Sequence, residues 1–276
     1  MEIQFASLDD TVARFTLDGS RPSFANALRR AMISEVPTLA IDDVRIYDNT
    51  SALFDEMLAH RLGLIPIKTD LATYSRKESC ACGGAGCPSC SVTYTLSVEG
   101  PKTVLSGDLI PQDPEALPVH DNVPIVKLIK GQKLVLEARA VLNTGREHAK
   151  WQPTVICGYK NYPAIAISDV CDACGMCVDE CPRDILAAKG KKVEVIDGKL
   201  PECSMCRLCE RACVATGIGD EPAIKVSAEP DRFIFVVEGD GALPVKEIIS
   251  RALQYIKGQS DDLEKQIHEI SGDEKK

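Results

Sequence analysis

The sequence predicts an α+β protein with more than one domain, and three patterns carry this prediction. A doubled run of cysteines occupies residues 171–213. Residues 92–98 and 133–142 alternate apolar with polar side chains, which is typical of half-buried strands. From residue 244 onward, apolar residues recur at helical spacing. The chain has 276 residues, of which 45% are hydrophobic, so it is long enough for two or three domains that bury their own cores.

Composition and charge exclude some functions. No apolar run reaches the roughly 18 residues of a membrane span, and the first residues contain no basic leader, so we expect a cytoplasmic protein. The 13 cysteines come in tight groups, which indicates metal ligation rather than disulfides. The formal net charge is −9, and metal-bound thiolates would make it more negative. Such a surface repels phosphate backbones, so we expect no direct nucleic-acid contact.

The first 42 residues predict two strands followed by a helix. Residues 2–5 and 11–17 alternate in part and precede the turn at Asp18-Gly19. Pro22 suits the first turn of a helix, which Pro37 should end. The apolar stripe of this helix consists of Phe24, Ala27, Leu28, Ala31 and Met32. The sequence leaves two interpretations of this stripe: it packs inside the chain, or it contacts a partner.

Residues 43–167 predict a mostly β domain. A second helix is expected at about residues 51–62, ending at Gly63, and a proline-rich loop is expected between residues 111 and 124. Cys157 lies in an apolar stretch, so we interpret it as a buried small residue rather than a reactive thiol.

A cysteine loop interrupts this β domain. Its candidate ligands are Cys80, Cys82, Cys87 and Cys90. Glycines between them let the backbone turn tightly, and four thiolates on one short loop suit tetrahedral zinc. Structural zinc is the favoured interpretation, with an iron–sulfur centre or an empty thiol loop as alternatives. A site with four protein ligands leaves no open position for catalysis.

The doubled run has the spacing of bacterial ferredoxins, Cys-x2-Cys-x2-Cys-x3-Cys, and it repeats after 32 residues with Val214 in place of Pro182. The resemblance to two-cluster ferredoxins implies that the fourth cysteine of each run serves the other cluster. The implied ligands of 4Fe-4S cluster one are Cys171, Cys174, Cys177 and Cys213. Those of 4Fe-4S cluster two are Cys203, Cys206, Cys209 and Cys181. A pair of four-cysteine zinc sites is the alternative, but zinc needs no doubled run.

The chain is expected to end in a strand at residues 232–238, a turn at residues 239–241 and a long helix from Pro244. The apolar stripe of this helix consists of Val245, Ile248, Ile249, Ala252, Leu253 and Ile256, and Leu263, Ile267 and Ile270 extend it past Gly258. A stripe of this length needs a partner surface, either within the chain or on another subunit.

Four stretches resemble the D-subunit family of archaeal RNA polymerase, the counterpart of the bacterial α amino-terminal domain. They are residues 22–38 (PSFANALRR and EVPT), residues 55–66 (DEMLAHRLGLIP), the loop at residues 80–90, and residues 233–241 (FIFVVEGDG). The resemblance implies a discontinuous dimerisation domain formed by residues 1–42 and 223–276. Residues 43–167 would be an inserted β domain, and residues 168–222 an inserted ferredoxin-like domain in an iron–sulfur form of the subunit.

The resemblance also implies a non-catalytic assembly subunit that forms a heterodimer with subunit L and a platform for the large catalytic subunits. The implied dimer interface combines the first and last helices, at Phe24, Ala27, Leu28, Ala31, Met32, Ile248, Ile249, Ala252, Leu253 and Ile256. Glu56, His60 and Arg61 lie in a family motif and either contact a large subunit or form a solvated helix face.

No Asp-x-Asp-x-Asp run or phosphate-binding glycine loop is present, so we expect no catalytic residue in this part of a nucleotidyltransferase complex. The clusters would then be structural or regulatory. The competing hypothesis is an electron-transfer protein of the ferredoxin type, and a zinc-stabilised adaptor outside transcription is a third.

Overall fold

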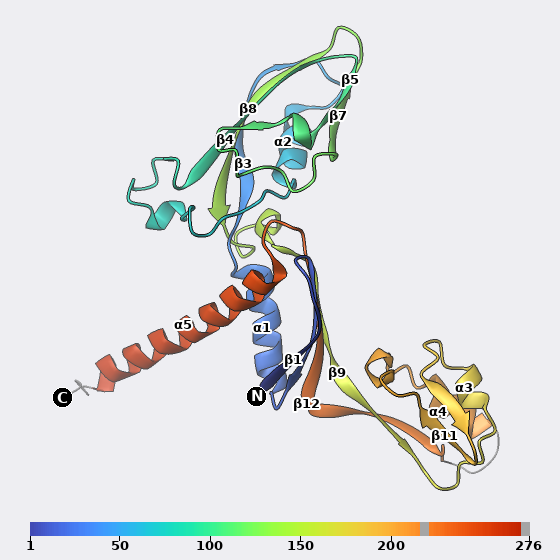
Figure 1. Cartoon of the computed structure of the whole chain (residues 1–276). Coiled ribbons are helices and arrows are strands. Elements are labelled where there is room, and N and C mark those ends of the chain that lie inside the picture. Colours follow the sequence, from blue (N-terminus) through green and yellow to red (C-terminus); the bar gives the residue numbers. More distant parts are fainter. Residues whose placement is uncertain (216–220, 272–276) are drawn as a thin grey trace. The chain divides into compact units, whose positions relative to one another are not determined.

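The structure is a computed structural model that describes residues 1–215 and 221–271 (Figure 1). The chain divides into two compact units. One contains Met1–Phe5, Phe15–Ala25 and Tyr159–Phe235, and the other contains Ala6–Arg14, Asn26–Gly158 and Val236–Lys276. Within the described ranges, no helix is long and apolar enough to cross a membrane. The fold combines helices with several sheets, as expected for an α+β protein.

A four-stranded sheet brings together strands from both ends of the chain in the order β1-β2-β12-β9. Its strands are β1 (Glu2–Leu8), β2 (Val12–Asp18), β9 (Thr154–Ile167) and β12 (Ile224–Gly239). The rings of Phe15 and Phe235 stack with their centroids 4.9 Å apart. Both positions lie in segments that alternate apolar with polar residues, which is why they share the buried face.

Strand β9 differs from the expected domain boundary. We assigned residues up to 167 to the inserted β domain, but β9 pairs with β12 in the sheet of the two chain ends. It is an edge strand, and most of its residues are only partly buried. Because neither face of the strand is uniformly apolar, periodicity could not mark it.

Helix α1 (Pro22–Ser34) and helix α5 (Val245–Ser271) match the two expected amphipathic helices. Helix α5 runs through Gly258 without a break. Ile248 and Ala252 near its start are fully buried, whereas Leu263 and Ile267 are more than half exposed. Within the described chain, the first half of this helix therefore packs into the core, and the apolar residues of its second half face solvent.

A second sheet has the order β3-β8-β4-β6, with antiparallel pairs throughout. Its strands are β3 (Thr38–Asn49), β4 (Ser91–Glu99), β6 (Ile110–Pro111) and β8 (Lys133–Asn143). The register places Tyr94 opposite Ala138 and Leu96 opposite Leu136, so apolar side chains gather on one face. Strands β5 (Lys102–Leu105) and β7 (Pro124–Leu128) form a further pair.

Helix α2 (Asp55–Gly63) buries Leu58 and Leu62 in the core of this sheet. The helix begins at residue 55 rather than near residue 51, because the side chains of Asn49 and Ser51 bond to the local backbone and compete with helix formation.

The segment with the doubled cysteine run contains two short helices and a hairpin. These are α3 (Met176–Asp179), α4 (Leu208–Ala215), and the antiparallel pair β10 (Leu186–Lys189) and β11 (Lys192–Val195). Helices α3 and α4 begin 32 residues apart, the same offset as the two cysteine runs. A 3-10 turn at Leu200–Glu202 precedes the second run, and other 3-10 turns lie at Lys77–Ser79, Ser106–Asp108 and Ala149–Trp151.

Candidate metal centres

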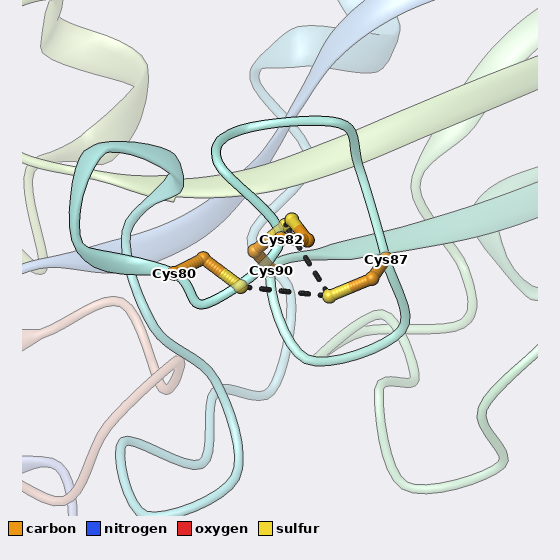
Figure 2. Close-up of side chains that lie close together, drawn as sticks. All are labelled: Cys80, Cys82, Cys87 and Cys90. Atoms are coloured by element: carbon orange, nitrogen blue, oxygen red, sulfur yellow. Dashed lines mark hydrogen bonds between the residues drawn. The ribbon is translucent and has the colours of Figure 1, made fainter.

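The cysteine loop before β4 brings four thiols to one point, as Figure 2 shows. The Sγ atoms of Cys80 and Cys87 are 3.5 Å apart, those of Cys82 and Cys90 are 3.7 Å apart, and those of Cys87 and Cys90 are 3.9 Å apart. A zinc–sulfur bond of about 2.3 Å places the sulfur atoms of a tetrahedral site about 3.8 Å from one another. The loop therefore has the dimensions of a four-thiolate zinc site.

The backbone of this loop depends on left-handed residues. Gly86 has φ +89°, and a Cβ atom there would lie 3.2 Å from Nη1 of Arg139. A larger residue would be strained by its φ angle and would also crowd this guanidinium group. The glycines noted in the sequence thus serve the turn around the thiols.

Local hydrogen bonds prepare one of these thiols for ligation. The main-chain N–H of Cys87, the thiol of Cys80 and the main-chain N–H of Gly86 lower the pKa of Cys82 to about 5. Burial and the neighbouring thiols raise the pKa of Cys90. A divalent cation takes the place of such thiol protons, since the thiolate is the metal ligand.

The doubled run lines two separate cavities. One is lined by the first three cysteines of run one together with the last cysteine of run two: Cys171, Cys174, Cys177 and Cys213. The other is lined by the reciprocal set: Cys181, Cys203, Cys206 and Cys209. Each cavity thus holds the four cysteines that the ferredoxin resemblance assigns to one cluster.

The two runs also share their backbone conformation. Ala173 and Met205 have φ angles of 59° and 53°, and Gly175 and Arg207 have φ angles of 84° and 59°. Each pair is separated by 32 residues, and each run therefore has left-handed residues directly before and after its second cysteine. Three of these residues are not glycine, so the loops hold a conformation that L-residues rarely adopt.

The spacing of the thiols separates these cavities from the zinc-type loop. In residues 1–215 and 221–271, the quartet of Cys80, Cys82, Cys87 and Cys90 is the single group of ligand atoms that all lie within 4.8 Å of one another. The thiols of the doubled run are spread more widely than one zinc ion requires, whereas a four-iron cluster holds its thiolates farther apart.

Burial follows the same symmetry. Cys177 and Cys209 are buried, and desolvation raises the pKa of both thiols. Cys174 and Cys206, the second cysteines of the two runs, are exposed. Each cavity therefore combines buried and solvent-facing sulfur atoms.

Backbone N–H groups reach two of the sulfur atoms. Met205 N lies 3.4 Å from Sγ of Cys203, and Ala223 N lies 3.2 Å from Sγ of Cys213. The half-buried Lys160 on β9 donates from Nζ to the main-chain oxygen of Cys203 at 2.7 Å. Lys160 was not predicted from the sequence, because no pattern around it marks a residue 43 positions away from its partner.

Cys157 is half-buried, and its Sγ lies 3.8 Å from the main-chain oxygen of Arg29. Burial raises the pKa of this thiol to about 11, which keeps it protonated near neutral pH. This agrees with the interpretation of a packed, unreactive cysteine.

The ten residues expected at a dimer interface divide into two groups. Six are buried within the chain itself: Leu28, Ala31, Met32, Ile248, Ile249 and Ala252. They form part of the chain's own core, so the alternative of internal packing applies to them. Phe24, Leu253 and Ile256 are partly accessible, and Ala27 is exposed. A partner can reach these four.

A groove lies between α1 and α5, lined by residues from both helices and by Arg146. Its floor and walls include Ala27, Ile256 and Leu263, and the guanidinium group of Arg146 donates to Glu35 at 2.6 Å. The groove therefore combines apolar side chains with polar ones from both helices, such as Arg30 and Gln259.

Comparison with known proteins identifies the family. Residues 44–156 match the RNA polymerase Rpb3/RpoA insert domain. The chain is 48% identical over 264 residues to the DNA-directed RNA polymerase subunit Rpo3 of Methanosarcina acetivorans, which covers 95% of this chain and 97% of that one. The Rpo3 subunit of Archaeoglobus fulgidus is 44% identical and covers 98% of each chain. The chain belongs to the Rpo3 family of archaeal RNA polymerase subunits.

Membership of the Rpo3 family confirms the expected relation to an archaeal polymerase subunit with a bacterial α-like domain. The similarity to Rpo3 subunits extends along 95% of the chain and is not confined to the doubled cysteine run. A ferredoxin-type carrier is therefore not favoured.

Proposed function

We propose that this chain is the assembly subunit that pairs with subunit L in archaeal DNA-dependent RNA polymerase and forms a platform for the large catalytic subunits. The observation that carries the proposal is the similarity to Rpo3 subunits along almost the whole chain, at up to 49% identity with the subunit of Methanosarcina mazei. As an Rpo3 family member, the chain has a non-catalytic role in transcription. The absence of an Asp-x-Asp-x-Asp run from the sequence agrees with that role.

The proposed surface for subunit L is the accessible seam of helix α5. Its residues are spaced alternately by three and four, and Ser260 is the single polar member of the seam: Leu253, Ile256, Ser260, Leu263, Ile267 and Ile270. Leu263, Ile267 and Ile270 are 58%, 55% and 87% exposed. A seam of this spacing suits packing against a second helix, and the groove beside α1 continues it.

The proposed cofactors are zinc at the Cys80–Cys90 loop and two 4Fe-4S clusters in the two cysteine-lined cavities. The thiol spacings support this division of metals. Four of the ten buried residues in the core of the doubled-run segment are cysteines, so apolar side chains alone supply only a small core there. Metal binding would then contribute much of the folding free energy of this segment, which makes a structural or regulatory role the natural one.

The pairing surface can be tested with a double substitution on α5. We expect Leu263→Asp with Ile267→Asp to abolish a stable heterodimer with subunit L on size-exclusion chromatography. Both side chains are exposed, so circular dichroism of the isolated chain should not change. Lys265→Asp on the opposite face of the same helix is the control and should leave the heterodimer intact. A heterodimer that survives the double substitution would overturn the proposed surface.

The role of the clusters needs a separate test. We expect the chain with all eight run cysteines changed to serine to pair with subunit L but to recruit the large subunits less in reconstituted polymerase. Normal recruitment would contradict a role in assembly. Anaerobic iron and sulfide analysis of the unmodified chain should give about eight irons for two four-iron clusters.

A further inference from the structure

The two cysteine-lined cavities differ in the charge of their walls. Among the residues that the structure describes, Arg183 and Arg207 are the charged residues that line the cavity of Cys181, Cys203, Cys206 and Cys209. Asp172 is the charged residue that lines the other cavity. A cluster in the first cavity would therefore have two arginines among its neighbouring residues, and a cluster in the second would have an aspartate.

The sequences of the two cysteine runs show the same difference in charge. Superposing the two runs by their offset of 32 residues places Ser204, Arg211 and Ala212 where run one has Asp172, Asp179 and Glu180. The same superposition places Arg207 and Glu210 where run one has Gly175 and Val178. Run one thus carries three carboxylates, whereas run two carries two guanidinium groups and one carboxylate.

Ion pairs around the cavities do not cancel this difference. Near Cys171, the cation Lys192 pairs with Asp169, so the two charges offset one another. Near run two, Glu210 accepts a hydrogen bond from the main-chain N–H of Val226 and lies 3.9 Å from Arg207.

The cation Lys160 adds to the positive charge beside Cys203, and Glu202 lies within its electrostatic range. Together with Arg183, Arg207 and Arg211, the surroundings of run two remain the more positive.

The solvent exposure of the cysteines is matched between the two cavities. Each cavity has one exposed cysteine, Cys174 or Cys206. Each also has a backbone N–H directed at a ligand sulfur, on Cys213 and on Cys203. Cluster potential depends on net charge, hydrogen bonds to sulfur and solvent exposure. In the second cavity the main-chain N–H groups of Leu208 and Glu210 also act on Cys206 and Cys209, so these hydrogen bonds favour reduction of cluster two in the same direction as the charge.

We propose that cluster two, held by Cys181, Cys203, Cys206 and Cys209, has the higher reduction potential and accepts the first electron, and that Arg183 and Arg207 set this order. The inference rests on the two clusters of the proposed function. The step is a one-electron reduction of the 2+ core to the 1+ core by a low-potential one-electron reductant, with no ligand bond broken. Guanidinium groups stabilise the added negative charge, and Asp172 opposes it at cluster one.

The test is a redox titration of the reconstituted full-length chain with dithionite and mediators, followed by electron paramagnetic resonance at low ionic strength. Two one-electron waves are expected. Arg183→Gln with Arg207→Gln should lower the midpoint potential of the upper wave by about 59 mV. For a one-electron couple this equals a tenfold change in the ratio of oxidised to reduced cluster at a fixed potential. The lower wave should not move. Asp172→Asn should raise only the lower wave, and the double Arg→Lys variant should restore the upper one.

The matched control is Lys189→Gln, which removes an exposed cation from β10 that lines neither cavity. Added salt should narrow the separation of the waves, because exposed charges are screened. Coincident waves, or an equal shift of both waves in the arginine variant, would overturn the inference while leaving two clusters in place. A content of about four irons per chain, or zinc in the cavities, would instead contradict the two clusters that the proposed function includes.

Discussion

Nε of Arg61 lies 2.9 Å from the main-chain oxygen of Ile125, so the guanidinium group ties helix α2 to strand β7. A second nitrogen of the same group donates to the main-chain oxygen of Pro124. The family motif at residues 55–66 suggested that Arg61 contacts a large subunit or water. Within its own chain, the two hydrogen bonds give Arg61 a structural role.

We expect Arg61→Ala to lower the free energy of unfolding by about 2 kcal/mol, because two carbonyl groups lose a charged donor. Arg61→Lys should recover only part of the loss, since an ammonium group lacks the planar fork. Urea denaturation of the metal-loaded chain measures both. The exposed neighbour Glu56→Ala serves as the control and should differ little from the parent chain. Equal stability of Arg61→Ala and the parent would contradict this role.

Cys82→Ser should remove zinc from the loop. Three thiolates remain, but the tetrahedral set is incomplete, and the pKa of Cys82 marks it as the ligand most ready to bind. Metal analysis should find about one zinc per chain in the parent and none in the variant. Cys157→Ser, at a half-buried thiol outside the loop, should keep its zinc. Zinc retained after Cys82→Ser would place the metal elsewhere.

Asp240 gives the stability a pH dependence. Its carboxylate accepts a hydrogen bond from Ala242 N at 2.9 Å, and burial raises its pKa to about 6. The folded state thus binds the proton more tightly than the unfolded state does. The stabilising contribution of Asp240 to folding is fully present at pH values below its unfolded-state pKa of about 3.9. It is lost as the pH rises through its folded-state pKa of about 6.

Asp240→Asn keeps an acceptor for Ala242 N but carries no charge. We expect it to be more stable than the parent by about 1 kcal/mol at pH 8, with a smaller advantage at pH 5. Urea titrations at the two pH values measure the difference. Asp262→Asn, at an exposed site on α5, is the control. An advantage that does not change with pH would show that the charge of Asp240 is not its cause.

Gly258 and Gly241 should respond to alanine in opposite directions. Gly258 lies in α5, and a Cβ atom added there would have nothing within 4 Å, so Gly258→Ala should stabilise the helix by about 0.5–1 kcal/mol. Gly241 has φ +88°, and its Cβ would lie 2.6 Å from Cγ1 of Val119. Gly241→Ala should therefore destabilise the chain. Thermal unfolding followed by circular dichroism measures both changes in stability. A lower melting temperature for Gly258→Ala, or a higher one for Gly241→Ala, would contradict the prediction.

Periodicity predicted the elements with one clean apolar face. Helices α1 and α5 and strands β4 and β8 lie close to their expected bounds, because a repeat of about 3.6 or 2 residues reports directly which side is buried. The resemblance to two-cluster ferredoxins grouped the same thiols that line each cavity.

Features that depend on contacts distant in sequence could not be predicted. The pairing of β9 with β12, the bonds of Arg61 to β7 and the reach of Lys160 to Cys203 join positions separated by 43 residues or more. No local pattern encodes such a partner. The charge difference between the two runs was readable from the sequence, but its relevance required knowing which side chains line each cavity.

The shared left-handed positions of the two runs bear on how such a repeat evolves. Where run one has Gly175, run two has Arg207, and both have φ angles in the left-handed region. The shape of these loops therefore tolerates a change from the smallest side chain to a large cation. A duplicated segment whose backbone is held in this way can keep its geometry while its copies diverge in chemical character, and the two halves need not stay interchangeable.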